Sequence, residues 1–307
     1  MTKELVIGSR GSKLALVQAE TIKAELERLD PTTAVRIEIV KTSGDVKTDP
    51  LSVIGGKGVF TKELEDALLD GRIDLAVHSL KDLPTILPDG LVIAAITKRE
   101  DPRDALVLNQ KIRITTPTIA ALPRGAIVGT SSPRRLAQLR SIRTDLVIND
   151  LRGNIDTRVR KLDEGQYDAL VLACAGLRRL GMADRISAAL APAEVLPAVG
   201  QGALGVECRA DDAETVELLS KLDHKFTRLA CTAERALLRS LGGGCQLPIA
   251  GYAIVRDKRI RLDGLVADPQ GRRLVKDRVS GALDEAEQLG MLLGARLLEQ
   301  GAAALMA

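Results

Sequence analysis

Residues 5–29 read LVIGSRGSKLALVQAETIKAELERL, and this stretch decides the class of fold. Its first residues, LVIGSR, form a short apolar run that is typical of a buried strand, and residues 12–29 then repeat apolar side chains at helical spacing. Ser12 belongs to the residue types preferred at helix N-caps, so we expect the helix to begin just after it. A buried strand that leads into a helix is the unit from which α/β sheets are built.

The same alternation of strand and helix continues to about residue 198. It predicts parallel sheets with helices on their faces. We therefore expect two similar doubly wound α/β units that face each other across a cleft. The strands are expected at 35–42, 73–80, 126–132, 146–150 and 167–176, and the helices at 61–71, 133–142 and 154–165.

The last third of the chain has a different pattern, which predicts an α+β domain with a small antiparallel sheet. Helices are expected at 213–222, 226–241 and 283–300, and strands at 251–257, 260–268 and 272–281. The predicted division is domain 1 at 1–98 with 199–218, domain 2 at 99–198, and domain 3 at 219–307.

Composition narrows the classes of function. Aromatic residues make up only 1% of the chain, which argues against a surface that stacks nucleic-acid bases. No apolar signal segment precedes the first strand and no window is long enough to span a membrane, so we expect a cytoplasmic protein without a membrane partner. The four cysteines form no CxxC pair and there are only two histidines, so we expect no protein-bound metal.

Arginine and hydroxyl side chains recur where strands lead into helices, and such helix N-termini are ready anion sites. Three turns of this kind point to one ligand with several negative charges. The phosphate-loop pattern fails at GGKG and no nucleic-acid motif accompanies the basic helix, so a carboxylate-rich small molecule remains. The residues concerned are Arg10 and Ser12 in SRGS, Thr130, Ser131, Ser132, Arg134 and Arg135 in GTSSPRR, and Arg152 and Arg158 in LRGNIDTR.

Asp82 and Cys245 are the two candidates for chemistry. Asp82 leaves an apolar strand next to Lys81, and its carboxylate either forms a turn before Pro84 or stabilises positive charge in a basic cleft. Cys245 follows three glycines, which let the backbone approach closely. A thiol near basic groups there would act as a nucleophile or attachment point. We expect the other three cysteines to be structural, and His78 to be a hydrogen-bonded site or core residue rather than a metal ligand.

Together these motifs resemble the porphobilinogen deaminase (hydroxymethylbilane synthase) family over essentially the whole chain. The resemblance rests on SRGSKLALVQA, GGKGVFTKELE, DLAVHSLKDLP, REDPRDA, GTSSPRR, LRGNIDTR, LPAVGQGALGVE, AERALL and GGGCQLPI, in this order. It implies two periplasmic-binding-protein-like domains and a third domain. It also implies a transferase that condenses four porphobilinogen molecules head to tail with loss of ammonia and then releases 1-hydroxymethylbilane.

The resemblance further implies a dipyrromethane cofactor joined to Cys245 by a thioether, with Asp82 as the catalytic aspartate. It implies that Lys57 and Phe60 belong to a loop covering the cleft, that Gln201 lies near the hinge between the first two domains, and that Gly176 supports the site. The carboxylate groups of cofactor and substrate would be bound by Arg10, Ser12, Lys57, Ser79, Lys81, Thr130, Ser131, Ser132, Arg134, Arg135, Arg152, Arg158 and Arg179.

The sequence departs from the usual family pattern at a few positions. Val53 and Ile54 stand where a lysine is common, which removes one expected carboxylate contact. Gly242 stands where glutamate is frequent, and we expect it to loosen the cysteine loop.

Two other functions compete with the enzyme. A non-enzymatic binder of an acidic solute would carry no covalent adduct, and a nucleic-acid-binding module would show salt-dependent binding. The family resemblance favours a monomer with porphobilinogen as its substrate.

Overall fold

The computed structural model describes residues 4–42, 61–244 and 247–306. The chain divides into two compact units, one of residues 1–100 with 203–228 and the other of residues 101–202 with 229–307. Each unit contains a five-stranded mixed sheet, and the second unit also contains a three-stranded antiparallel sheet. These sheets confirm the α/β class with an additional small antiparallel sheet. The two larger sheets are mixed and not parallel as expected, because the strands at 204–209 and 104–108 run antiparallel to their neighbours.

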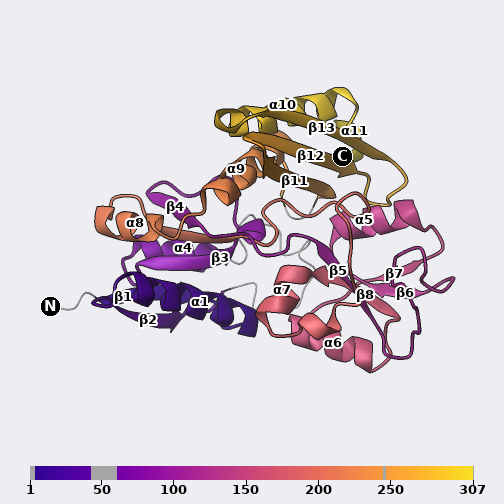
Figure 1. The fold of residues 1–307 in the computed structure, drawn as a ribbon, viewed down its shortest axis with the longest axis horizontal. Helices are drawn as coiled ribbons and strands as arrows, with labels where there is room; N and C mark the ends of the chain where they lie inside the picture. The colour runs from indigo at the N-terminus through magenta and orange to yellow at the C-terminus, as the bar shows by residue number, and fades with distance from the viewer. Residues whose placement is uncertain (1–3, 43–60, 245–246, 307) are drawn as a thin grey trace. The chain divides into compact units, whose positions relative to one another are not determined.

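The first unit is built on the sheet order β2-β1-β3-β10-β4, in which β1 runs parallel to β2 and β3 while β10 is antiparallel to β3 and β4 (Figure 1). The late strand β10 lies in the middle of this sheet, so the chain returns to the first unit after residue 202. The elements are β1 (Glu4–Ser9), α1 (Lys13–Leu29), β2 (Ala34–Ile39), α4 (Lys62–Leu69), β3 (Leu75–Ser79), η1 (Leu80–Asp82), β4 (Leu91–Ile96), β10 (Leu204–Arg209) and α8 (Ala213–Ser220).

Alternating side chains of β3 separate two cores in this unit. Leu75 and Val77 pack with residues of α1 such as Ile22, whereas Ala76 packs with Leu64 and its neighbours on α4. Successive residues of a strand point to opposite faces, so helices cover both faces of the sheet. Ser12 caps α1 as expected, with its hydroxyl accepting a hydrogen bond from the Ala15 backbone N–H at 3.3 Å.

The second unit begins with the sheet order β7-β6-β8-β5-β9. One difference from expectation lies in the residues after Ala173, where the strand ends and a helix starts at Cys174 instead of continuing to Gly176. Cys174 is nevertheless fully buried. The elements are β5 (Asp104–Leu108), β6 (Ile127–Gly129), α5 (Pro133–Ile142), β7 (Val147–Asn149), α6 (Ile155–Asp163), β8 (Ala169–Ala173), α7 (Cys174–Arg179), η2 (Ala183–Arg185) and β9 (Ala188–Ala189).

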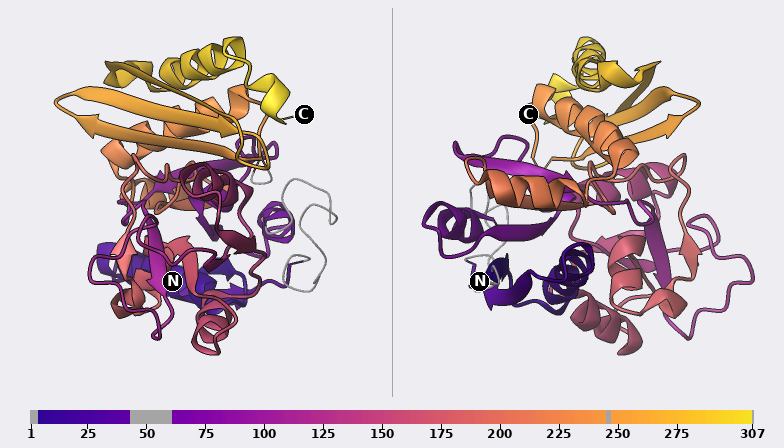
Figure 2. Two further views of the ribbon diagram at one scale, coloured as in Figure 1. Left: turned by 90° about the vertical axis from the view of Figure 1, so that its right-hand side faces the viewer. Right: turned by 60° about the vertical axis from the view of Figure 1, so that its left-hand side comes forward.

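The C-terminal part of the second unit is an antiparallel sheet with helices on one face (Figure 2). A Cβ placed on Gly264 would meet Leu237 of the first of these helices and Leu293 of the next, so both pack on the same side of the sheet. The elements are α9 (Lys225–Ser240), β11 (Ile249–Arg256), β12 (Arg259–Ala267), β13 (Leu274–Ala282), η3 (Leu283–Glu285), α10 (Ala286–Glu299) and α11 (Ala303–Met306). The first turn of α9, to Arg228, is assigned to the first unit.

The opposite face of this small sheet packs on α5. Leu265 and Ala250 share a core with Ala137 of that helix, and a Cβ on Gly271 would lie 2.4 Å from the Ala137 carbonyl oxygen. The two sheets therefore form one compact unit, whereas we expected separate domains for 99–198 and 219–307. Residues 219–228 belong to the first unit in this division, and the three-domain description stays a prediction.

Gly242 ends helix α9. Its φ is +62°, a left-handed conformation that glycine adopts without steric cost. The Gly242 and Gly243 N–H groups donate to the carbonyls of Arg239 and Leu238 at 3.0 and 3.1 Å, which closes the last turn. The glycine therefore terminates the helix, in addition to any loosening of the loop that follows.

Glu234 on α9 connects two distant parts of the second unit. Its fully buried carboxylate accepts hydrogen bonds from the backbone N–H groups of Gly200 at 2.7 Å and of Ala253 on β11 at 2.8 Å. Glu234→Gln presents an amide N–H₂ to one of these donors, so we expect it to lower the free energy of unfolding by about 1–3 kcal/mol. Urea unfolding measures this loss.

Glu287→Gln is the matched control, because Glu287 is an exposed residue of α10 that pairs with Arg239 across the surface. Loss of this exposed ion pair should change the free energy of unfolding by less than about 1 kcal/mol. Equal effects of the two substitutions would contradict the role given to Glu234.

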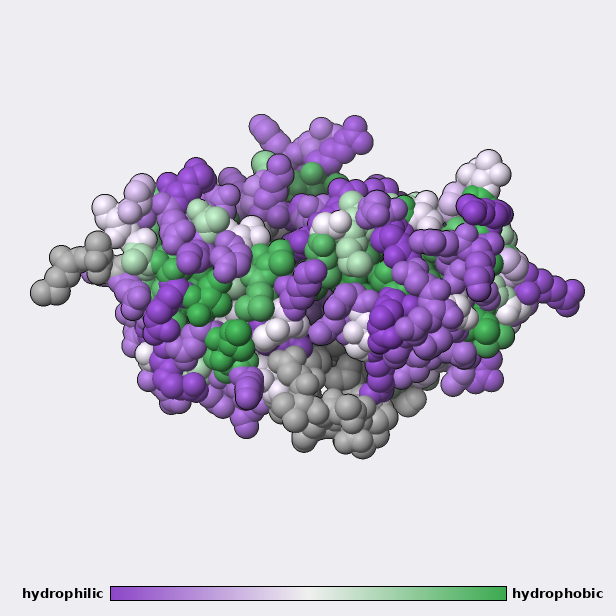
Figure 3. Space-filling model, turned by 90° about the horizontal axis from the view of Figure 1, so that it is seen from below, coloured by the Kyte–Doolittle hydropathy of each residue, from purple (hydrophilic) through white to green (hydrophobic). Residues whose placement is uncertain are grey.

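The surface of the protein is mixed. Figure 3 shows mainly hydrophilic residues on one face with apolar residues scattered among them. The exposed large apolar side chains of the described residues include Ile39, Ile86, Phe226 and Met291. Among the helices of the described ranges, none has the length and apolar character needed to cross a membrane.

Candidate active site

A small pocket of about 70 Å³ lies at one edge of the first unit's sheet. It contains an acid, a base and several hydroxyl and amide groups that come from four segments. The lining residues are Arg10, Ser12, Leu14, Ala15, Gln18, Thr61, Val77, His78, Ser79 and Asp82. Four of the predicted site residues, Arg10, Ser12, Ser79 and Asp82, are thus brought together here.

The topology explains why these residues meet. Strands β1 and β3 are adjacent and parallel, so their carboxyl ends lie at the same edge of the sheet. Arg10 follows β1 directly, and Asp82 lies on the 3-10 turn η1 that follows β3. The Leu80 N–H donates to the Ala203 carbonyl at 3.0 Å, which ties this turn to the residue before β10.

The carboxylate of Asp82 is exposed at this pocket. In the part of the chain that the structure describes, it has no hydrogen-bond or ion-pair partner of its own. Nearby, the Gln18 amide Nε2 donates to the Ser79 hydroxyl at 2.9 Å. Gln18 is almost fully buried in α1 and therefore holds Ser79 in place beside the acid.

Below the pocket lies a group of buried ionisable residues. His78 Nε2 is 2.9 Å from Glu207 Oε2, and both side chains are almost fully buried. Burial, above all, raises the pKa of Glu65 on α4; the Glu207 charge adds to this, while the Thr61 hydroxyl and His78 oppose it. His78 is thus buried, as expected for a core histidine, but its Nε2 lacks the expected hydrogen bond among the described residues, and its neighbour Glu207 was not predicted.

In the second unit, the turn from β6 into α5 contains the predicted hydroxyl and arginine residues. The Thr130 hydroxyl accepts from the Ser132 N–H at 3.2 Å, and Ser132 caps α5 by accepting from the Arg135 N–H at 3.5 Å. Pro133 stands at the first turn of the helix, where its missing N–H has no cost. Ser131 is exposed beside them.

The guanidinium groups of Arg134 and Arg135 are buried and bind Asp104, which is itself fully buried. Arg134 donates to Asp104 Oδ2 at 2.7 Å and Arg135 to Oδ1 at 2.7 Å. Further donors of the two arginines reach the carbonyls of Leu196 at 2.8 Å and Val171 at 3.0 Å. Both arginines thus have a partner within the protein that the sequence did not reveal, and their binding of ligand carboxylates stays a prediction.

The electrostatics of this buried group follow from its composition. Burial acts to raise the pKa of Asp104, but the charges and hydrogen bonds of Arg134 and Arg135 together hold it well below its usual range. Burial lowers the pKa of Arg134 despite the attraction of Asp104. Two guanidinium groups with one carboxylate leave an excess of positive charge at the start of α5, which suits an anionic ligand.

Three other predicted arginines of the second unit also have hydrogen-bond partners within it. Arg152 donates to Asp150 at 2.7 Å and Arg158 to the Gly153 carbonyl at 2.7 Å, both at the start of α6. Arg179, at the end of α7, donates to the Gly202 carbonyl at 2.7 Å. Each of the three arginines thus donates a hydrogen bond to a group within the second unit, and their binding of ligand carboxylates stays a prediction.

The two residues predicted to support the site are buried in this unit. Gln201 donates to the Pro102 carbonyl at 2.7 Å and to Asp104 Oδ1 at 3.0 Å, and Gly176 lies inside α7. Lys81 is half-buried on η1 of the first unit. Lys57, Phe60 and Cys245 lie outside the described residues, as do the departures at Val53 and Ile54.

Sequence reasoning gave no role to Gln18, Glu65, Asp104 or Glu207. Asp104 stands in the quoted REDPRDA motif, so the motif was noticed without a function for its last acid. Among residues that the structure describes, no group of three or more His, Cys, Asp or Glu side chains is placed to hold a metal ion.

A pocket that joins a carboxylate to arginine and hydroxyl groups defines a site for a negatively charged small molecule, and comparison with known proteins gives its class. Residues 5–217 match the model of the porphobilinogen deaminase dipyromethane cofactor binding domain, and residues 228–299 match that of the porphobilinogen deaminase C-terminal domain. The chain belongs to the porphobilinogen deaminase family, and it is an enzyme of the transferase class.

Curated relatives agree over nearly the full length. The porphobilinogen deaminase of Synechococcus elongatus is 52% identical over 297 residues, covering 96% of this chain and 92% of the relative. That of Chromobacterium violaceum is 51% identical over 305 residues, covering 99% and 97%. Such coverage favours the enzyme over the non-enzymatic binder that the sequence left open.

Solved structures of solute-binding proteins align only loosely. The aliphatic sulphonate binding protein SsuA from Escherichia coli is 18% identical with a TM-score of 0.41, covering 78% of this chain and 71% of that one. A probable amino-acid transporter binding protein from Bacillus subtilis is 12% identical with a TM-score of 0.42, covering 72% and 90%. At this level of agreement the two alignments add nothing to the assignment.

Proposed function

We propose that this protein joins four porphobilinogen molecules head to tail, releases one ammonia for each, and hydrolyses the product to 1-hydroxymethylbilane. The observation that carries the proposal is the exposed carboxylate of Asp82 in a pocket with Arg10, Ser12 and Ser79, in a chain of the porphobilinogen deaminase family. An acid and a guanidinium group in one small pocket suit a substrate that carries both an ammonium group and carboxylates.

Asp82 is the proposed catalytic residue. When the bond between the substrate methylene carbon and its nitrogen breaks, ammonia leaves and positive charge develops on the pyrrole. An ionised carboxylate beside the ring stabilises that charge, and electrostatic help of this kind is typically worth about 10²–10³ in kcat. The ring carbon that is then joined to the methylene loses a proton, which restores the aromatic ring.

Arginine and hydroxyl groups are the proposed ligands of the acetate and propionate groups. Each added ring brings two more carboxylates, so an increasing number of cationic and hydroxyl groups is needed. In the described part of the first unit these are Arg10, Ser12, Ser79 and Lys81, and in that of the second unit Thr130, Ser131, Ser132, Arg134, Arg135, Arg152, Arg158 and Arg179. Lys57 is added by motif alone.

The donor set fits the dipyrromethane cofactor that names the family's binding domain. Arg10 and the two serine hydroxyls of the first unit's pocket are suited to bind its carboxylates. In the second unit, the excess positive charge of Arg134 and Arg135 over Asp104 is also suited to carboxylates. When bound, the cofactor supplies the free pyrrole carbon to which the first substrate ring is joined. We propose Cys245 as its point of attachment through a thioether.

The attachment predicts a covalent mass. The purified protein is expected to be heavier than its sequence by a two-pyrrole unit, and peptide mapping is expected to locate this increment on the peptide that contains Cys245. The reason is that a thioether survives denaturation and proteolysis, whereas a reversibly bound solute is lost. Intact-protein and peptide mass spectrometry measure both quantities.

Cys245→Ser is the control, and it should have the mass of its sequence alone. A parent protein that is active without any increment would overturn the attachment. An unmodified parent that binds an acidic solute reversibly, without turnover, would instead support the non-enzymatic binder.

Localisation, oligomeric state and partners of the enzyme can also be proposed. We propose a cytoplasmic monomer whose small-molecule partner is porphobilinogen, without nucleic-acid or membrane partners. The scarcity of aromatic residues supports the absence of base stacking. Sedimentation with and without substrate tests the monomer.

A further inference from the structure

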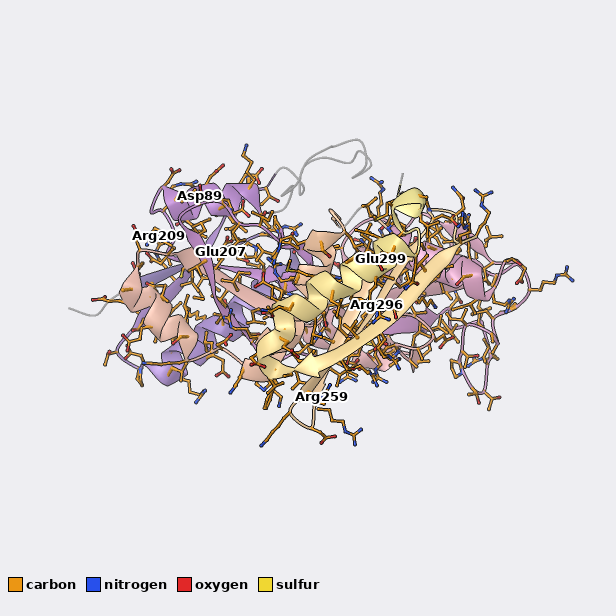
Figure 4. All side chains as sticks on the ribbon, turned by 90° about the horizontal axis from the view of Figure 1, so that it is seen from above. Asp89, Glu207, Arg209, Arg259, Arg296 and Glu299 are labelled. Carbon is orange, nitrogen blue, oxygen red and sulfur yellow. The ribbon has the colours of Figure 1, made fainter. Side chains whose placement is uncertain are left out.

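A buried imidazole and a buried carboxylate meet under the pocket of the first unit. His78 on β3 pairs in register with Gly205 of β10, and Glu207 pairs with Ala76, so His78 and Glu207 are diagonal neighbours on one face of the sheet. His78 Nε2 and Glu207 Oε2 are 2.9 Å apart, with side chains 4% and 0% exposed. Figure 4 labels Glu207 on its strand within this unit.

The two groups lie at ion-pair distance, but their atoms lack the alignment of a hydrogen bond. Within the described ranges, neither His78 Nε2 nor either carboxylate oxygen of Glu207 has a hydrogen-bond partner. Burying such groups is costly, and a buried ion pair is weak evidence for stability. Because burying His78 and Glu207 costs folding free energy, their position beside the pocket indicates that they have a function in it.

The pair is continuous with the pocket, since the His78 side chain is part of the lining that also includes Asp82. The other charged groups around it are Glu65 from α4 and Arg10 from the turn after β1. Because the side chains of His78 and Glu207 are buried, a change of one charge on either of them is weakly screened by water and acts on the carboxylate that shares the pocket with His78.

We propose that His78, charge-paired with Glu207, is a positioning residue that sets the pH range in which Asp82 acts. This inference rests on the proposed function, because it concerns the same pocket. The imidazolium balances the charge of Glu207, so that Asp82 meets a nearly neutral pair beneath it. Without the cation, the uncompensated Glu207 would disfavour the ionised form of Asp82.

The test compares two single substitutions with opposite effects on charge. His78→Gln keeps an Nε2 donor but removes the cation, so the acidic limb of the kcat profile should move to higher pH by about one unit, the size expected for one nearby charge. Glu207→Gln removes the anion instead, so the same limb should move to lower pH. KM at the pH optimum should change less than threefold in both variants.

The double substitution His78→Gln with Glu207→Gln restores neutrality, so its acidic limb should return to the parent position, which a merely structural role would not produce. Glu27→Gln, which removes a charge from the exposed side of α1, is the control and should leave the profile unchanged. If the parent turns over porphobilinogen and all variants that fold keep its profile, the inference is wrong. If the parent itself forms no product, the proposed function is wrong and the inference falls with it.

Discussion

Asp82→Asn is expected to abolish nearly all turnover while leaving the fold intact. The substitution preserves the shape of the side chain and removes only its charge. Because the carboxylate is exposed at the pocket, little folding free energy depends on it. The charge is needed only when the substrate becomes cationic, so kcat should fall by at least about 10²–10³. Single-turnover and steady-state assays of 1-hydroxymethylbilane measure the loss.

Asp89→Asn is the matched control for this experiment. Asp89 is an exposed aspartate of the same unit, labelled in Figure 4, and it is not part of the pocket lining. It should retain the parent kcat and melting temperature. Near-normal product formation by Asp82→Asn would remove Asp82 from the catalytic role, whereas a large loss of melting temperature would show that the residue is structural.

The sequence predicted the parts of this site that depend on local pattern. A strand that runs into a capped helix is visible in residues 5–29, and parallel neighbours place their carboxyl ends at one edge. In the fold these two features bring Arg10 and Ser12 together with Ser79 and Asp82, although Ser79 was predicted only through the family resemblance. The family motifs then gave the roles proposed for the same residues, which geometry alone does not give.

The buried partners could not be predicted in this way, because they depend on long-range pairing. Asp104 lies thirty residues before Arg134 in the chain. Nothing in the local pattern of either segment states that β5 will carry that carboxylate under α5. The contact between His78 and Glu207 likewise depends on the register of β3 with β10, which a one-residue slip would destroy. A run of arginines in the sequence therefore does not reveal that an internal acid also binds them.

Asp104→Asn is expected to cause the largest loss of stability among the substitutions considered. The change leaves two buried guanidinium groups with a neutral acceptor in place of a carboxylate that binds both of them. Removing one partner of a buried ion pair typically costs about 3–5 kcal/mol. The free energy of unfolding in urea measures the loss. Asp163→Asn, which removes a partly exposed pair with Arg185 in the same unit, should cost less than about 1 kcal/mol.

The effect of Asp104→Asn should also depend on pH in a definite direction. In the folded protein the two arginines hold the pKa of Asp104 well below its usual range, whereas in the unfolded chain the pKa of an aspartate is about 3.9. At a pH between these two pKa values, Asp104 is protonated in the unfolded chain but ionised in the folded protein. The free energy that ionised Asp104 contributes to folding is therefore fully present above the pKa of the unfolded chain and is lost as the pH falls to the pKa of the folded protein. The difference between parent and variant should therefore be constant near neutrality and shrink below about pH 4. A difference that grows in acid would mean that Asp104 is not ionised in its arginine site.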